Sequence, residues 1–233
     1  MPLQSGLKKL NRNIMIKLIN VIEISPLLYA KDDYELPETF DDPDPEEWFS
    51  RWEEAASQLN FNFKIIEKGS YLADIETIDD ENLQMILEER LKDFEKNSEE
   101  EDLVLAFDGG VALEKNSTIY IKPTCCSDMS DLKNWQDIFT NPSEEWTMMW
   151  IGHPWVLYRK ENGKISFSEY TESGEIDPGN IKTLMEVEES ELKAEFEKVL
   201  QRQADFKNRI SDLLKKTSIK NKERIAELLT GMD

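Results

Sequence analysis

Apolar positions along the chain follow two spacings, one typical of strands and one typical of helices. Short runs rich in β-branched and aromatic residues, bounded by Gly, Pro, Asn or Asp, predict strands. Such runs lie at residues 14–24, 61–66, 103–107, 118–122, 146–151, 155–160 and 164–170. Asn162-Gly163 joins the last two and predicts a tight hairpin, because both turn positions require positive φ angles. Asp108-Gly109-Gly110 predicts a turn after the run at 103–107.

Apolar residues three and four positions apart predict helices at 44–58, 80–96, 131–139, 189–216 and 220–229. In the first of these, Asp44 and Pro45 suit a helix start, and Trp48 and Trp52 share one face, which predicts that both tryptophans are core anchors. The long helix carries a heptad seam that one glutamine interrupts, formed by Leu192, Phe196, Val199, Gln203, Phe206, Ile210 and Leu213. Two interpretations of this seam stay open. The helix lies across the sheet of its own chain, or it forms a homodimer through residues 189–216.

These elements together predict an α+β fold, with a mainly antiparallel or mixed sheet flanked by helices and a long C-terminal helix. The 233 residues are few enough for one main core. We expect a main α+β domain over residues 1–187. Residues 188–233 would then be a helical segment that packs on this domain or dimerises.

Segments that would place the chain in a membrane or outside the cell are not evident in the sequence. No apolar run approaches the roughly 18 residues of a membrane helix, and residues 1–13 lack the apolar stretch of a secretory signal. Cys125 and Cys126 are adjacent, so they cannot cross-link distant segments, and we expect two reduced thiols. The chain is therefore expected to be cytoplasmic and to avoid membranes.

Charge changes the picture more than any other property. The chain has 28 basic and 49 acidic residues, a net charge of −21. Residues 31–101 hold 24 acids and 7 bases, a net of −17, whereas residues 198–224 hold 9 bases and 3 acids, a net of +6. Nucleic-acid binding depends on Lys and Arg neutralising phosphates, so this balance argues against a nucleic-acid partner. It favours a basic protein partner, although the same charge could serve only solubility.

The proline-bearing segment at 31–47 is the leading candidate for a binding surface. It combines aromatic residues with carboxylates, as interfaces combine apolar anchors with polar rims. The candidate residues are Tyr34, Phe40, Asp41, Asp42, Asp44, Glu46 and Glu47. The run lacks the alternation and the glycine of an EF-hand loop, so we expect no calcium site.

A second candidate is an enzyme active site or a small-ligand pocket in the region 121–155. His153 is the only histidine, and it could serve as base for a thiol nucleophile at Cys125 or Cys126. Trp150 and Trp155 would line such a pocket. The competing interpretation gives His153 a structural hydrogen bond in its turn and places both tryptophans in the core. Two cysteines and one histidine fall short of a zinc site, so neither metal nor cofactor is expected.

Residues 121–172 include Lys122-Pro123-Thr124-Cys125-Cys126 and Trp150-Ile151-Gly152-His153-Pro154-Trp155. This stretch resembles uncharacterised bacterial proteins of the kind associated with toxin immunity. The resemblance covers about a fifth of the chain and carries no functional residue over. It implies a protein that needs no small molecule and blocks a partner by surface contact, rather than an enzyme.

Overall fold

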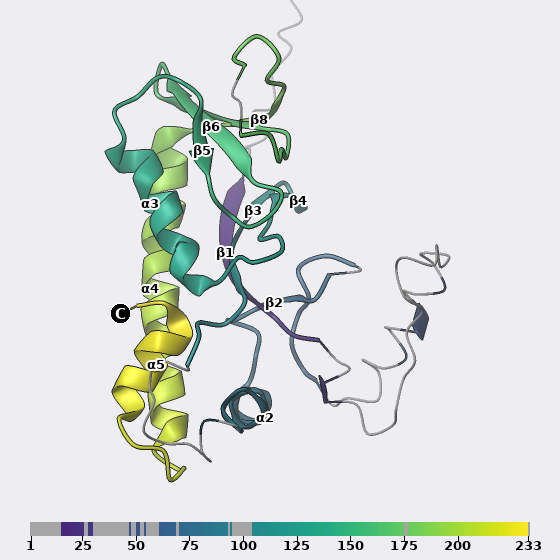
Figure 1. Cartoon of the computed structure of the whole chain (residues 1–233), viewed down its shortest axis with the longest axis vertical. Helices are drawn as coiled ribbons and strands as arrows, with labels where there is room; N and C mark the ends of the chain where they lie inside the picture. The colour runs from purple at the N-terminus through teal and green to yellow at the C-terminus, as the bar shows by residue number, and fades with distance from the viewer. Residues whose placement is uncertain are drawn as a thin grey trace, which may run out of the picture.

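The chain is an α+β protein with two antiparallel sheets and a long helix beside them (Figure 1). We describe it from a computed structural model. This structure describes residues 15–25, 28, 29, 47, 50, 51, 54, 61–68, 70–92, 94, 104–174 and 177–232. The predicted α+β class, with its long helix near the C-terminus, is confirmed.

The first sheet has the order β2-β1-β3-β4. Its strands are β1 (Ile16–Glu23), β2 (Leu72–Asp74), β3 (Gly109–Lys115) and β4 (Thr118–Ile121). β1 pairs with β3 in the register Ile16↔Lys115 to Ile22↔Gly109. Since β1 is a central strand, six of its eight residues are buried, Asn20 among them, and its sequence is mostly apolar without a strict alternation of apolar and polar positions.

The second sheet is a meander of four strands in sequence order. They are β5 (Thr147–Met149), β6 (Val156–Glu161), β7 (Lys164–Ser168) and β8 (Thr183–Glu188). Asn162 and Gly163 connect β6 to β7 with φ angles of 52° and 76°. The predicted hairpin is therefore confirmed, with the positive φ angles that its turn requires.

Four described helices surround the sheets: α2 (Asp80–Leu91), α3 (Leu132–Thr140), α4 (Glu189–Leu214) and α5 (Lys222–Thr230). A short 3₁₀ turn, Met129–Asp131, precedes α3. α4 runs along the length of the molecule, beside α3 at one end and α5 at the other (Figure 1). Among the described residues, no helix has both the length and the hydropathy needed to cross a membrane.

α4 completes the hydrophobic core at both ends of the molecule. Its N-terminal half packs with the two sheets and α3, and its C-terminal half packs with α2 and α5. Every residue of the predicted heptad seam is buried. The seam therefore faces the core of its own chain. Because this apolar stripe is already covered, it is not available for the alternative, a homodimer through residues 189–216.

Gln203, which interrupts this seam, is 1% exposed and joins three elements. Its amide nitrogen donates to the carbonyl oxygens of Met129 at 3.1 Å and Thr230 at 2.6 Å. Its amide oxygen accepts from the Asn20 amide at 3.2 Å. The glutamine thus ties α4 to β1, to the 3₁₀ turn and to α5, and an apolar residue would leave the carbonyl oxygens of Met129 and Thr230 without this donor.

Three local predictions are wrong. The run at 103–107 was predicted as a strand, but its described residues, 104–107, form none. Gly109 and Gly110 open β3 instead of forming a turn, with φ angles of 137° and 136°. The strands approach so closely there that a Cβ on Gly109 would lie 2.3 Å from the Val21 carbonyl oxygen. The predicted strand at 61–66 forms only an isolated bridge, between Ile65 and Ala73. The predicted helix at 44–58, with Trp48 and Trp52, lies mostly outside the described residues.

Candidate functional site

Five residues meet where the segment that follows β4 lies against the segment between β5 and β6. They are Cys125, Cys126, Trp150, His153 and Trp155, and we call them the thiol and tryptophan cluster. Cys125 and His153 form an isolated antiparallel bridge, in which the His153 amide donates to the Cys125 carbonyl oxygen at 2.8 Å. The residues of the second candidate site are therefore adjacent in space, although Cys126 and Trp150 are 24 positions apart in the sequence.

The two segments can meet because Gly152 and Thr124 face each other at this point. A Cβ on Gly152 would lie 2.5 Å from the carbonyl oxygens of Thr124 and Cys125, and the φ angle of Gly152 is 99°. The Thr124 amide donates to the Ile151 carbonyl oxygen at 2.8 Å. Its hydroxyl donates to the carbonyl oxygens of Ile151 and Pro154 at 3.0 and 2.8 Å. Only glycine fits at position 152, because any other side chain would separate the segments.

The three rings of the cluster contact one another at the surface. Trp150 and Trp155 stack with ring centroids 6.0 Å apart. The His153 ring lies edge-on to both, with centroids 4.6 Å from Trp150 and 5.2 Å from Trp155. His153 is exposed and both tryptophans are half-buried. Neither tryptophan is fully buried, and neither belongs to the buried core clusters, so both retain some solvent contact.

Both thiols of the cluster are exposed and lie next to each other. The Sγ atoms of Cys125 and Cys126 are 3.3 Å apart, and Cys126 adopts a φ angle of 70°. The hydrogen bond with Cys126 raises the pKa of the Cys125 thiol, with smaller contributions from the charge of Cys126, from burial and from Glu23. An activated nucleophilic cysteine needs a lowered pKa. The direction of this shift therefore argues against a thiol nucleophile.

Side chains at the start of α3 hold the cluster in place, and sequence reasoning missed them. Asp131 accepts hydrogen bonds from the Ser127 hydroxyl and the Asn134 amide, each at 3.0 Å. The same Asn134 amide donates to the Trp150 carbonyl oxygen at 3.0 Å. Burial raises the pKa of Asp131, and the hydrogen bonds from Ser127 and Asp128 partly offset this. Asp131 thus couples the cysteine segment to Trp150, and no spacing in the sequence indicated this.

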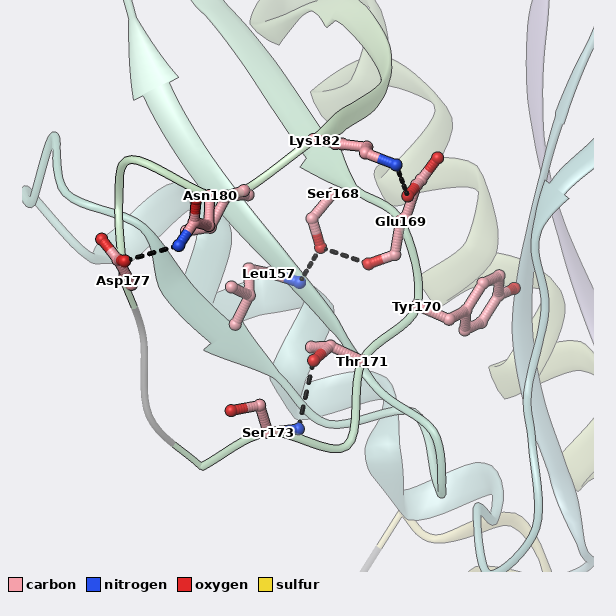
Figure 2. Close-up of a pocket in the computed structure, with 10 residues that line it drawn as sticks. Leu157, Ser168, Glu169, Tyr170, Thr171, Ser173, Asp177, Asn180 and Lys182 are labelled. Carbon is pink, nitrogen blue, oxygen red and sulfur yellow. Dashed lines mark hydrogen bonds and ion pairs between the residues drawn. The ribbon is translucent and has the colours of Figure 1, made fainter.

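A hollow of about 420 Å³ is lined in part by Thr171 (Figure 2), the residue that forms an isolated bridge with Trp155. Its polar groups satisfy one another: Ser168 accepts from the Leu157 amide at 2.8 Å, and Asn180 donates to Asp177 at 2.7 Å. A ligand site needs polar groups that converge on the ligand. The side chains drawn in Figure 2 pair along the rim instead. Within the described part of the chain, no three metal-ligating side chains gather.

The leading candidate surface falls largely outside the described residues. This applies to Tyr34, Phe40, Asp41, Asp42, Asp44 and Glu46. Glu47 is described; it is exposed and forms an ion pair of 2.8 Å with Arg51. The acidic surface over residues 31–47 therefore remains a prediction.

Carboxylates of the described part of residues 31–101 are extensively paired with basic side chains. Glu76 contacts Arg202 at 3.0 Å, and Asp80 contacts Arg209 at 2.8 Å, so α4 supplies two of these partners. Glu67 pairs with Lys122, and Asp74 with Lys17. The described acidic groups are thus partly neutralised within the molecule, which weakens the case for a continuous acidic face.

Comparison with known proteins adds no relative. No family model matches the chain, and neither a curated protein nor a solved structure matches it.

Proposed function

We propose that the chain is a protein-binding module whose contact surface is the thiol and tryptophan cluster and whose partner is a basic protein. One observation carries this proposal: two half-buried tryptophans stack on each other, and an exposed histidine lies edge-on to both, on a tightly held backbone. Tryptophan is enriched among the residues that dominate binding energy at protein interfaces. A rigid aromatic surface also loses little conformational entropy when a partner binds.

The charge of the chain supports a basic partner even though many acids are paired. Each ion pair removes one positive and one negative charge, so the pairs leave the net charge of −21 unchanged. A field of this sign attracts a positively charged protein and speeds its encounter, and salt weakens the effect. In the same proposal the protein acts in the cytoplasm. It blocks its partner by contact, which is what the resemblance of residues 121–172 implies.

The cluster supports binding better than catalysis. An exposed thiol with a raised pKa is mostly protonated at neutral pH and therefore a weak nucleophile. The described hollow nearby has its polar groups paired along its rim. A contact surface needs neither an activated nucleophile nor an enclosed cavity, and it uses the aromatic rings directly.

The test compares capture of a basic protein by three forms of the full chain at low and at high salt. Trp150→Ala combined with Trp155→Ala removes the aromatic contact. We expect it to weaken binding by about 30-fold or more, as loss of an interface hot spot does. Met148→Ala is the matched control, because Met148 is a large apolar residue, 51% exposed, on the neighbouring strand β5. It should bind as the unchanged chain does.

The proposal is supported if the unchanged chain and Met148→Ala both retain the same basic protein at low salt and release it at high salt. The double tryptophan variant should fail to retain that protein. Equal capture by all three forms would place the contact elsewhere and contradict the proposal. Capture of an acidic protein, or of none, would also contradict it. Circular dichroism of both variants verifies that each remains folded.

A further inference from the structure

The two cysteines belong to the proposed contact surface, but they also share a geometry that the contact through the aromatic rings does not require. Their sulfur atoms lie 3.3 Å apart, and both side chains are exposed. A disulfide would require about 2.05 Å, so the sulfurs are in non-bonded contact. The chain contains no other cysteine. The pair is therefore a dithiol that is open to solvent and has both sulfurs at one point of the surface.

We propose that Cys125 and Cys126 form a two-thiolate binding site for a single soft, thiophilic metal or metalloid centre, such as the trivalent arsenic of an arsenical. This site stands independently of the proposed protein partner. It uses only the two sulfurs as protein ligands, because no group of three metal-ligating side chains occurs in the described part of the chain.

The separation of the sulfurs fits a chelate. A thiolate bond of about 2.3 Å to a metal, with a bond angle of roughly 90–110°, places two sulfurs about 3.3–3.8 Å apart. The observed 3.3 Å lies at the lower end of this range. One centre can therefore bind both sulfurs with little movement of either side chain.

The fold holds the dithiol in this arrangement before any ligand binds. Cys125 is fixed by its bridge to His153, and the Ser127 amide donates to the Thr124 carbonyl oxygen at 3.2 Å, which closes a turn around the pair. Cys126 occupies a positive φ of 70°, a conformation that is costly for residues other than glycine. Such a backbone lowers the entropy that the two thiols lose on chelation.

The binding step balances without a change of oxidation state. An arsenical of the form R–As(OH)₂ reacts with two thiols to form two As–S bonds. Two S–H and two As–OH bonds break, and the two protons leave with the two hydroxyl groups as two molecules of water. A metal ion would instead displace the two protons into solvent. The thiol hydrogen bond that raises the Cys125 pKa breaks when both sulfurs bind.

The test uses phenylarsine oxide, whose hydrated form has the composition described above, and the full chain. The protein is treated with the compound in an excess of a monothiol and examined by intact-mass spectrometry. We expect one arsenic per chain, retained in the monothiol and removed by a dithiol. Cys125→Ser and Cys126→Ser should each weaken retention by about 100-fold or more, because the second bond no longer acts at high effective concentration.

Two further forms test what the fold and the histidine contribute. His153→Ala should retain the arsenical as the unchanged chain does, because only the sulfurs bind it. The chain unfolded in urea keeps its cysteines adjacent in sequence but loses the backbone that holds them, so its retention should fall.

Three results would overturn the proposal. The first is no retention by the folded chain although both thiols react with a maleimide. The second is equal retention by a single-serine variant, and the third is equal retention by the unfolded chain. None of these measurements involves a protein partner, so they are separate from the tests of the aromatic contact.

Discussion

Aromatic and apolar residues gather in two regions of this molecule, and the regions differ in what covers them. In the seam of α4, Phe196 and Phe206 are 4% and 2% exposed and pack against the elements of their own chain. In the thiol and tryptophan cluster, Trp150 and Trp155 stack while still contacting solvent. In this molecule, apolar residues at helical spacing are buried and stabilise the fold. The aromatic residues around the tight Gly152-His153-Pro154 segment instead remain available for contact with a partner.

The largest expected effect concerns the buried side of this comparison. Phe206→Ala should lower the free energy of unfolding by about 3–5 kcal/mol, because it removes a fully buried ring and leaves a cavity. Trp150→Ala should cost less, about 1–2 kcal/mol, because part of that ring already contacts water. Urea denaturation of both variants measures the difference. A larger loss for Trp150→Ala would mean that the cluster serves mainly as core.

Gln203→Leu tests whether the polar residue of the seam is structural. The variant should be destabilised by about 2–3 kcal/mol, because it leaves the carbonyl oxygens of Met129 and Thr230 without their donor. Gln201→Leu is the matched control, since Gln201 is exposed and donates to the side chain of Asp205 on the same helix. Equal stability of the two variants in urea denaturation would contradict the role assigned to Gln203.

Gly152→Ala tests the close approach that builds the exposed cluster. We expect a loss of about 2 kcal/mol in the free energy of unfolding, from the positive φ and from contacts with two carbonyl oxygens. Gly163→Ala, also at positive φ but with no atom within 4 Å of the new Cβ, isolates the effect of the contacts. It should cost less and should leave the fluorescence of the stacked tryptophans unchanged. Altered fluorescence in Gly163→Ala alone would contradict the assignment.

The smallest expected effect concerns Glu23, whose charge also acts on Cys125. Burial, with a contribution from Asp108, raises the Glu23 pKa above its ordinary value of 4.5. Glu23 therefore loses its proton less readily in the folded than in the unfolded chain. The free energy of unfolding falls as the pH rises from the ordinary glutamate pKa through the raised pKa of Glu23. Glu23→Gln should be slightly more stable than the unchanged chain at neutral pH and equally stable below the ordinary glutamate pKa.

Glu197→Gln, at an exposed position of α4, controls for the loss of one negative charge in general. Urea denaturation at both pH values gives the comparison. If Glu197→Gln and Glu23→Gln gave the same pH dependence, the effect would come from net charge and not from the local environment of Glu23.

Elements with strong local signals could be predicted from the sequence. The seam of α4, the Asn162-Gly163 hairpin and the capped helix α2 each depend on residues close together in the chain. β2 and β8 were missed: β2 has only three residues and gives no pattern, whereas β8 does alternate between buried apolar and exposed acidic residues from Met185 to Glu188, a signal that was overlooked. The glycines of β3 were misinterpreted because their close neighbour, Val21, is distant in sequence.

The candidate site was predicted only in part. The sequence indicated its five residues through their chemical types alone. No spacing in the sequence predicted that they would lie together in space. The contacts that bring them together involve Thr124, Asn134 and Asp131, which are ordinary polar residues of the sequence. Their roles arise from tertiary contacts, so no local pattern could have identified them. The preferred acidic surface at residues 31–46 lies outside the described residues.

The position of α4 also sets when the chain can fold during its synthesis. β1 begins at residue 16, yet the helix that covers it starts at residue 189. The Asn20 amide reaches the Val199 carbonyl oxygen and the Gln203 side chain across more than 170 residues. A ribosome must therefore finish most of the polypeptide before either half of the interior can close. Contacts of such long range slow folding, and the nascent chain would expose β1 for most of its translation.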